Sequence, residues 1–394
     1  MNPISQSQRE LVERARLFVK KELLPLEAGL ETERGLSLGV SNTIVEKARV
    51  AGLFAGNIGK QFGGQGFSTV ENILLQEQLG ATKEILARRA GGNVYECLAS
   101  GSGEQIERYL LPSVRGERFC GLAVSEPEAG SDAAAIRTRV EKTTNGWRLS
   151  GTKHFTSDAE FCDFFIVAAV TEPGLGARGI SLFLVDRDLP GFELGKTFHM
   201  MGFRGTSHRE LLFHDIELPP GALLGELNNG FRMLGDTLGK ARLAKVGARA
   251  VGKCQRLLHL MKQHATNRRQ FGKTIGEFGP VRQMIADSAI EIAAARALLM
   301  QTAVNIDAAA GATDRAIRAD ISAVKVFTTE TLGRVADRAL QIFGGSGCHE
   351  DSLVESFYRD ARLYRIIDGT SEIHRDIVAQ NVYKSGLPCP VAFQ

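Results

Sequence analysis

The chain has 394 residues, which is long enough for two or three domains of ordinary size. Hydrophobic residues make up 43% and charged residues 24% of the sequence, a balance that excludes disordered, collagen-like and disulfide-scaffold proteins. The net charge of +3 is too small to predict a nucleic-acid or membrane partner from bulk electrostatics.

The six cysteines are scattered and form no CxxC pair, so they predict the reduced thiols of a cytosol rather than a disulfide framework or a metal site. The N-terminal residues contain glutamates and helical periodicity where a signal peptide needs an apolar run. No segment approaches the roughly 18 consecutive apolar residues of a membrane span. We therefore expect a cytoplasmic protein with no membrane and no nucleic-acid partner.

Helical periodicity dominates the N-terminal third of the chain. In residues 10–21, apolar residues such as Leu11 and Ala15 recur at the spacing of one buried helix face. The glycine-rich segment 63–66 interrupts this pattern, and residues 69–79 resume it.

The middle of the chain changes to a period of two, which is typical of strands. The predicted strand segments are residues 136–140, 164–170, 180–185 and 209–218. These segments are not interleaved with helices, and this order argues against a doubly wound α/β sheet.

Long helical patterns return in the C-terminal part of the chain. One face of a predicted helix carries Val281, Ile285, Ser288, Ile292, Ala295 and Leu299. The sequence therefore predicts a mainly α protein with a middle β domain, divided into domains at residues 1–119, 120–228 and 229–394.

Residues 174–179 match the GxGxxG pattern of dinucleotide-binding folds. That function needs a helix directly after the glycines, because the helix N-terminus faces the pyrophosphate. The next residues predict a strand instead, so we interpret the glycines as a hairpin turn.

Four segments carry residues suited to chemistry, in order from the strand block to the second helical block. They read Ala-Val-Ser-Glu-Pro-Glu-Ala-Gly-Ser-Asp at 123–132, Gly-Thr-Lys-His-Phe-Thr-Ser-Asp at 151–158, Asn-Arg-Arg-Gln-Phe-Gly-Lys at 267–273, and Gln-Ile-Phe-Gly-Gly-Ser-Gly at 341–347 followed by Ile-Asp-Gly-Thr-Ser-Glu-Ile at 367–373. Together they resemble the acyl-CoA dehydrogenase family of flavoproteins over nearly the whole chain. The resemblance implies an N-terminal helical domain, a β-barrel-like domain and a C-terminal four-helix domain. It also implies FAD, an acyl-CoA or acyl-carrier substrate, an electron-transfer flavoprotein as acceptor, and a homotetramer.

The resemblance assigns several side chains to FAD. Ser125 would hydrogen-bond the flavin, Phe155 would lie against its ring, and Ser157 would place a hydroxyl beside N5, although each serine alone could equally be a turn residue. Arg268 and Phe271 match residues that reach the pyrophosphate and adenine bound by a neighbouring subunit, and a guanidinium is suited to phosphate. The remaining implied contacts with the cofactor are Gln341, Gly344, Gly345 and Thr370.

The implied reaction is α,β-dehydrogenation of a thioester, in which a carboxylate takes the α-proton and the β-hydrogen leaves as hydride to flavin N5. The base is usually Glu, whereas this chain has Asp368, whose reach is shorter by about 1.5 Å, one C–C bond. A bulky or cyclic acyl group, or a shifted backbone, would restore the distance that proton transfer needs. The other position used for the base in the family corresponds to about Ala241, which cannot serve.

Alternatives to this reading stay open. Asp368 could be the N-cap of the helix that follows it. The same scaffold could also support a flavin oxidase or a non-redox lyase instead of a dehydrogenase.

Substrate contacts follow from the same resemblance. Ser131 and Arg242 match residues near CoA, and Gly369 lies beside the base. The family has an acidic residue three positions before the arginine that matches Arg242. In this chain Gly239 stands there instead.

Arg88 falls where the family lines the far end of the acyl pocket. It could meet a carboxylate or another polar end of the acyl group, because an unpaired buried arginine is costly. We favour the alternative that Arg88 and Arg89 point to solvent or pair with Glu84.

Overall fold

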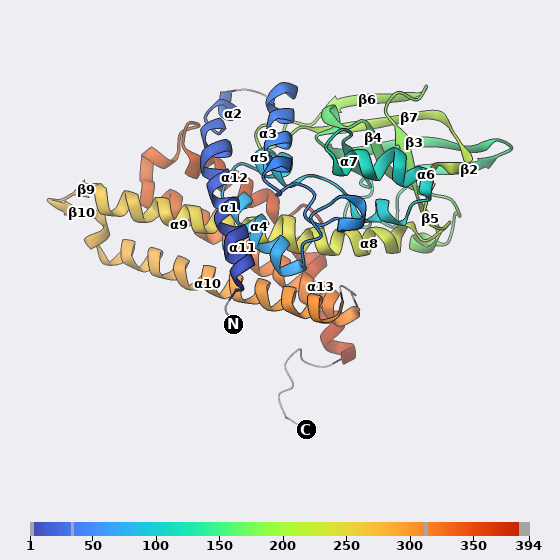
Figure 1. The fold of residues 1–394 in the computed structure, drawn as a ribbon. Coiled ribbons are helices and arrows are strands. Elements are labelled where there is room, and N and C mark those ends of the chain that lie inside the picture. Colours follow the sequence, from blue (N-terminus) through green and yellow to red (C-terminus); the bar gives the residue numbers. More distant parts are fainter. Residues whose placement is uncertain (1–3, 33–34, 311–313, 386–394) are drawn as a thin grey trace.

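The computed structural model describes residues 4–32, 35–310 and 314–385. Helices of the N-terminal part, a central sheet and long C-terminal helices follow one another along the chain (Figure 1). The predicted mainly α fold with a middle β domain is therefore confirmed.

The N-terminal helices begin at polar caps. Ser5 and Ser68 each accept a backbone N–H of the first turn, and Gln8 and Glu71 bond back to the cap, which closes a capping box. These caps start the helices predicted at residues 10–21 and 69–79, which are confirmed. The helices are α1 (Gln6–Phe18), continued by the π-helical turn η1 (Val19–Leu23), then α2 (Gly29–Thr32), α3 (Leu38–Val50), α4 (Thr69–Gly80), α5 (Glu84–Gly91), α6 (Gly103–Gln105), η5 (Ile106–Leu110) and α7 (Leu111–Val114).

The central sheet has eight strands in the order β6-β7-β3-β2-β4-β5-β8, with β1 parallel to β4. They are β1 (Cys120–Ala123), β2 (Arg139–Thr143), β3 (Gly146–Ser157), β4 (Phe164–Val170), β5 (Ile180–Asp186), β6 (Phe192–Thr197), β7 (His208–Leu218) and β8 (Leu223–Leu224). Strands β4 and β5 are antiparallel, with Val170 opposite Ile180. The glycines at 174–179 therefore form the predicted hairpin turn.

One predicted strand begins later than expected. Residues 136–138 precede β2, although Ile136 and Thr138 are buried. The backbone N–H groups of Arg137 and Thr138 donate to the carboxylate of Glu126, at 2.6 and 2.9 Å. The N–H groups of this segment are therefore held by a side chain, and its contact with a neighbouring strand begins at Thr138, whose carbonyl oxygen accepts the Val170 N–H at 2.8 Å.

The C-terminal part is a bundle of long helices. A continuous helix runs through α8 (Gly230–Ala241), the π-helical turn η9 (Arg242–Ala248) and α9 (Arg249–Asn267). A hairpin of β9 (Arg269–Gln270) and β10 (Lys273–Thr274) follows, then α10 (Gly279–Ala308), α11 (Arg315–Phe343), α12 (Leu353–Tyr364) and α13 (Ser371–Ser385). The face of α10 predicted from periodicity is confirmed, since Ser288, Ile292, Ala295 and Leu299 are buried.

Among the described helices, α10 alone has the length and apolar composition that could cross a membrane. A core helix of a helical bundle meets the same criteria, and α10 packs along α9 and α11.

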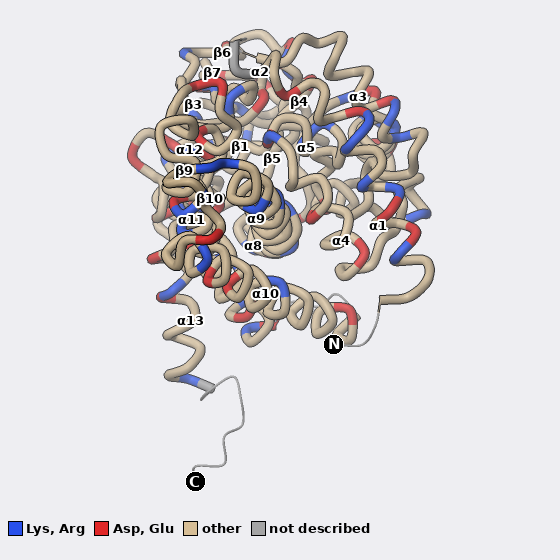
Figure 2. The backbone as a smooth tube through the Cα atoms, turned by 90° about the vertical axis from the view of Figure 1, so that its left-hand side faces the viewer, with Lys and Arg blue, Asp and Glu red and all other residues tan. Residues whose placement is uncertain are grey.

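Charged residues of both signs are interspersed over the helices and strands (Figure 2). The five described cysteines are free, four of them buried and Cys348 exposed, whereas Cys389 lies outside the described residues.

Candidate functional site

A buried ion pair locks the segments at 123–132 and 151–158 together. Lys153 Nζ lies 2.7 Å from Glu126 Oε1 and 2.9 Å from the carbonyl oxygen of Val124, and its side chain is fully buried. Burial opposes ionisation of Glu126, but the Lys153 ammonium beside it keeps the pKa of this carboxyl below its ordinary value. The pair fixes the start of one segment against the centre of β3.

Phe155 and the two candidate flavin hydroxyls lie around the end of β3. The His154 N–H donates to the carbonyl oxygen of Ser125 at 2.8 Å, which places Ser125 beside Phe155. A register shift between β3 and β7 spans Phe155, whose φ is 59°, and such bulges turn a side chain out of the ladder. The ring of Phe155 is 47% exposed.

These residues fit the expected flavin. The half-exposed ring of Phe155 offers a flat apolar surface. The hydroxyls of Ser125 and Ser157 donate to and accept from no other described residue, and the buried Thr156 hydroxyl has no partner either. Such groups have hydrogen-bonding capacity left for a polar ring edge.

The loop that carries Asp368 is held by its backbone carbonyls. Arg242 Nε donates to the carbonyl oxygen of Asp368 at 2.8 Å, and His374 Nε2 lies 3.0 Å from the same atom. Lys325 Nζ donates to the carbonyl oxygen of Gly369 at 2.7 Å. The Asp368 carboxylate itself makes no hydrogen bond within the described part of the chain, so it is available to a ligand.

The backbone of this loop is in the left-handed region. Asp368 has φ 54° and Gly369 has φ 94°, and a Cβ at Gly369 would lie 2.8 Å from His374 Nε2. Non-glycine residues at positive φ are uncommon, and such strain often accompanies a functional site.

Helix capping does not explain Asp368. Helix α13 begins at Ser371, and the Thr370 hydroxyl accepts the N–H of Ile373 at 3.4 Å. The alternative that Asp368 is the N-cap is therefore wrong, because Thr370 performs this role. The contact of Thr370 with the cofactor stays a prediction.

The two residues expected to contact CoA differ in their burial and in the parts of the chain that surround them. Ser131 is exposed in the loop between β1 and β2. Arg242 is half-buried against the Asp368 loop, which sequence reasoning did not foresee. Both CoA contacts stay predictions.

Our favoured expectation for Arg88 and Arg89 is wrong. Arg88 Nε lies 2.6 Å from Asp158 Oδ2, in a pair whose side chains are 18% and 5% exposed. Glu84 is instead bound by Arg249 and by the hydroxyl of Tyr364. Both arginines turn inward, and for Arg88 the carboxylate of Asp158 offsets the cost of desolvation.

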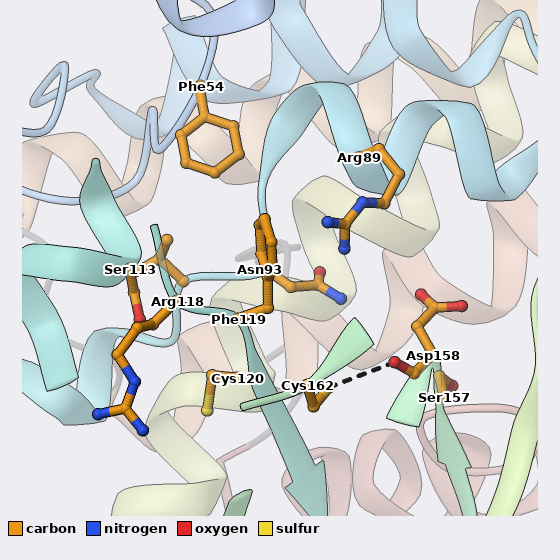
Figure 3. A pocket seen from close by; sticks show the side chains of 11 residues that line it. Phe54, Arg89, Asn93, Ser113, Arg118, Phe119, Cys120, Ser157, Asp158 and Cys162 are labelled. Carbon is orange, nitrogen blue, oxygen red and sulfur yellow. Dashed lines mark hydrogen bonds between the residues drawn. The ribbon is translucent and has the colours of Figure 1, made fainter. Parts of the chain in front are cut away.

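Arg89 lies over the rings of Phe119 and Phe161, with its guanidinium carbon 4.1 and 5.0 Å from their centres. Arg89, Ser157 and Asp158 all line one small cavity (Figure 3). The cavity has a volume of about 20 Å³, room for one water. Two nitrogens of Arg89 and one Asp158 oxygen have no protein partner, which such a water would supply.

Arg88 connects β3 to the Asp368 loop. It pairs with Asp158, next to Ser157. Burial raises the pKa of the Tyr95 hydroxyl, while the charge of Arg88 lowers it and that of Asp368 raises it, so Tyr95 lies near both groups. We call the resulting set the central cluster: Ser125, Phe155, Ser157, Asp158, Arg88, Arg242, Asp368, Gly369 and Thr370.

The other predicted cofactor residues form a second set, which we call the hairpin cluster: Arg268, Phe271, Gln341, Gly344 and Gly345. The rings of His264 and Phe343 stack at 4.2 Å and join the ends of α9 and α11 that carry it. Phe271, with φ 52°, is 93% exposed at the tip of the β9–β10 hairpin. This hairpin lies at the opposite end of the molecule from the sheet (Figure 1). Within one chain, the structure does not bring the two clusters together.

Sequence reasoning missed the residues that support the central cluster. Lys153 and Glu126 stood inside the quoted segments, and their opposite charges were the only signal. Lys245 and Arg249 follow Arg242 at helical spacing on one face, a pattern that could have been noticed.

A larger cavity, of about 620 Å³, was also not foreseen. It lies between α11 and α12, and four of its lining residues are Arg334, Arg338, Arg362 and Arg365.

Comparison with known proteins agrees with this arrangement. The chain matches the N-terminal domain of acyl-CoA dehydrogenase over residues 5–117, the middle domain over 121–216 and the C-terminal domain over 228–383. It is 34% identical to acryloyl-CoA reductase (NADH) of Anaerotignum propionicum over 97% of this chain and 95% of that one. It is 35% identical to cyclohexane-1-carbonyl-CoA dehydrogenase of Syntrophus aciditrophicus over 77% of each chain.

A third relative is the subunit CarC of the caffeyl-CoA reductase–Etf complex of Acetobacterium woodii, 32% identical over 96% of this chain and 99% of that one. Among solved structures, butyryl-CoA dehydrogenase of Megasphaera elsdenii superimposes with a TM-score of 0.89 at 26% identity, covering 98% of this chain and all of that one. The FAD complex of PigA gives the same TM-score at 26% identity over 97% and 99% of the two chains. This chain belongs to the acyl-CoA dehydrogenase family of flavin-dependent oxidoreductases, whose members bind FAD.

Proposed function

We propose that the protein catalyses α,β-dehydrogenation of an acyl-CoA thioester and that Asp368 removes the α-proton. One observation carries the proposal. The carbonyls of Asp368 and Gly369 are bound by Arg242, His374 and Lys325, while the Asp368 carboxylate makes no hydrogen bond to a described residue. A general base needs a fixed position and a free lone pair, and this loop provides both.

FAD, when bound, supplies the acceptor for the hydride that leaves the β-carbon. Ser125, Phe155, Ser157 and Thr370 would hold the flavin end of the cofactor in one subunit. The hairpin cluster is too exposed to have a role inside its own chain, and it would hold the phosphates and adenine in a neighbouring subunit.

The short side chain of Asp368 affects which acyl groups the site would accept. One missing methylene withdraws the carboxylate by about 1.5 Å, which leaves room for a bulky or cyclic α-carbon. The similarity to a cyclohexane-1-carbonyl-CoA dehydrogenase supports this preference.

Further features complete the proposal. We expect a homotetramer, because the hairpin cluster gains a role only across a subunit boundary. An electron-transfer flavoprotein is the expected acceptor, which the similarity to the CarC subunit supports. We also propose a cytoplasmic location, and domains that end near residues 119 and 228.

Anaerobic mixing of the yellow holoenzyme with a panel of acyl-CoA thioesters tests the reaction. Straight-chain, alicyclic and dicarboxylic members are included, and bleaching of the flavin absorbance is followed. Asp368→Asn keeps the size of the side chain but cannot accept the proton, so bleaching should slow by about two orders of magnitude or more while FAD is retained.

Three results would contradict the proposal: a colourless protein that cannot be reconstituted with FAD, no bleaching by any thioester, or unchanged bleaching in Asp368→Asn. Fast reoxidation of the bleached flavin by oxygen would instead identify an oxidase on this scaffold.

A further inference from the structure

Three cations follow one another along the π-helical turn η9 and the start of α9. Arg242, Lys245 and Arg249 follow one another at intervals of three and four residues. Arg242 binds the Asp368 loop, and Arg249 binds Glu84 at 2.5 Å. Lys245 lies between them.

Lys245 has a different kind of partner. Its Nζ donates to the amide oxygen of Asn93 at 3.2 Å and lies 5.4 Å from the centre of the Tyr95 ring. Among the described residues, no carboxylate is within ion-pair distance of this ammonium. It is therefore a half-buried cation that is solvated by an amide and an aromatic face.

The electrostatic setting agrees with that geometry. Burial lowers the pKa of Lys245 to about 8, and the charges of Glu96 and Asp368 oppose this shift only in part. The neighbouring cations Arg249 and Arg88 lower it further. An anion bound at Lys245 would relieve this poorly compensated charge.

The position of Lys245 relative to Asp368 indicates which anion. Lys245 follows Arg242 by three residues in the same helix, and Arg242 binds the carbonyl oxygen of Asp368, so Lys245 lies near the proposed base. An anionic group at the far end of an acyl chain whose α-carbon is at Asp368 is therefore a candidate ligand for Lys245. Asp158 compensates the charge of Arg88 at 2.6 Å, whereas the only hydrogen-bond partner of the Lys245 ammonium among the described residues is the neutral amide of Asn93, so Lys245 is the cation with more to gain from an anionic ligand.

We propose that Lys245, with Asn93 and Tyr95, binds a carboxylate at the far end of the acyl group, so that the substrate is a dicarboxylic acyl thioester. The inference rests on the proposed function, because Asp368 fixes where the α-carbon lies. It moves the recognition of a polar acyl end from Arg88 to Lys245.

Length-matched pairs of thioesters test this inference with the holoenzyme. Succinyl-, glutaryl- and adipyl-CoA are compared with butyryl-, pentanoyl- and hexanoyl-CoA by titration calorimetry, which does not depend on flavin reduction. For at least one pair, the dicarboxylic member should bind about tenfold or more tightly, the value of a charged hydrogen bond. Lys245→Met, which keeps an unbranched apolar chain, should abolish this preference.

Three further variants sharpen the result. Lys245→Arg should retain the preference, because it restores a cation. Lys245→Gln, which keeps a polar end without the charge, should abolish the preference and replaces Lys245→Met if that variant does not fold. Lys262→Met, at an exposed position of α9, should leave all affinities unchanged.

The outcomes separate this inference from the proposed reaction. Equal affinities within every pair, or a preference that survives in Lys245→Met, would overturn the inference even if Asp368→Asn stops bleaching. Selective binding through Lys245 without any bleaching would support the inference and contradict the reaction.

Discussion

The central cluster and the hairpin cluster are built in opposite ways. In the central cluster, the protein provides the partners: Lys153 binds Glu126, Arg88 binds Asp158, and Arg242 binds the Asp368 carbonyl. In the hairpin cluster, Phe271 is 93% exposed, and Arg268 is exposed beside it.

This difference separates two tasks. Groups that take part in chemistry must be fixed before the substrate arrives, and buried charge pairs provide that rigidity. Exposed groups at the tip of a hairpin can be ordered only by another molecule. We infer that the first cluster is complete in one chain, and that the second depends on assembly.

Lys153→Met should have the largest effect, because it breaks the support of the central cluster. It leaves the Glu126 carboxylate buried without its cation, which typically costs about 3–5 kcal/mol of unfolding free energy. Urea unfolding measures the loss. The control is Arg148→Met on the same strand, which removes an exposed pair with Glu217 and should hardly shift the midpoint. Equal shifts for the two variants would mean that the buried pair gives no special support.

Arg268→Ala tests the other side of the comparison. The fold of the chain should be unaffected, because this side chain is exposed. FAD retention should fall by about tenfold to a hundredfold, as expected for a lost charge-assisted contact with phosphate. Flavin released on dialysis and the sedimentation coefficient are measured together, with Lys262→Ala on the preceding helix as control. A holo-monomer that retains its flavin in both variants would refute the dependence on assembly.

Arg242→Met tests whether the hydrogen bond from Arg242 to the Asp368 carbonyl positions the base. The kcat should fall by about tenfold, since a net hydrogen bond of about 1 kcal/mol is lost from the loop, while FAD content stays the same. Arg242→Lys should recover part of the rate by restoring a donor. If KM rises while kcat stays constant in both variants, Arg242 is a CoA contact instead of a positioning residue.

Asp368→Glu should give the smallest change, because the carboxylate is kept. The longer side chain should crowd bulky or cyclic thioesters and favour straight-chain ones, so the ratio of their bleaching rates should shift by severalfold. An unchanged ratio would show that the short side chain does not select the acyl group.

The order of helices and strands was predictable because each part of the chain has its own periodicity. The predicted start of the strand at 136–140 was too early. Alternating apolar residues resemble a strand even where the Glu126 carboxylate holds the backbone N–H groups. The residues expected to contact the cofactor could be assigned only by resemblance, since Ser125 or Phe155 alone carries no distinctive pattern. The predicted environment of Arg88 was wrong because its partner, Asp158, is 70 residues away in sequence.

The π-helical turn η9 has a consequence for helical phase. A π turn accommodates one residue more than an α turn, so the faces of α8 and α9 are offset by about 100°, the rotation of one residue. Deleting a single residue between Arg242 and Ala248 would make the helix more regular. It would also rotate Arg249 away from Glu84 or Arg242 away from Asp368, depending on which end of the helix keeps its packing. The irregular turn therefore lets one helix make contacts in two directions. One end anchors the loop of the base, and the other end binds the N-terminal helices.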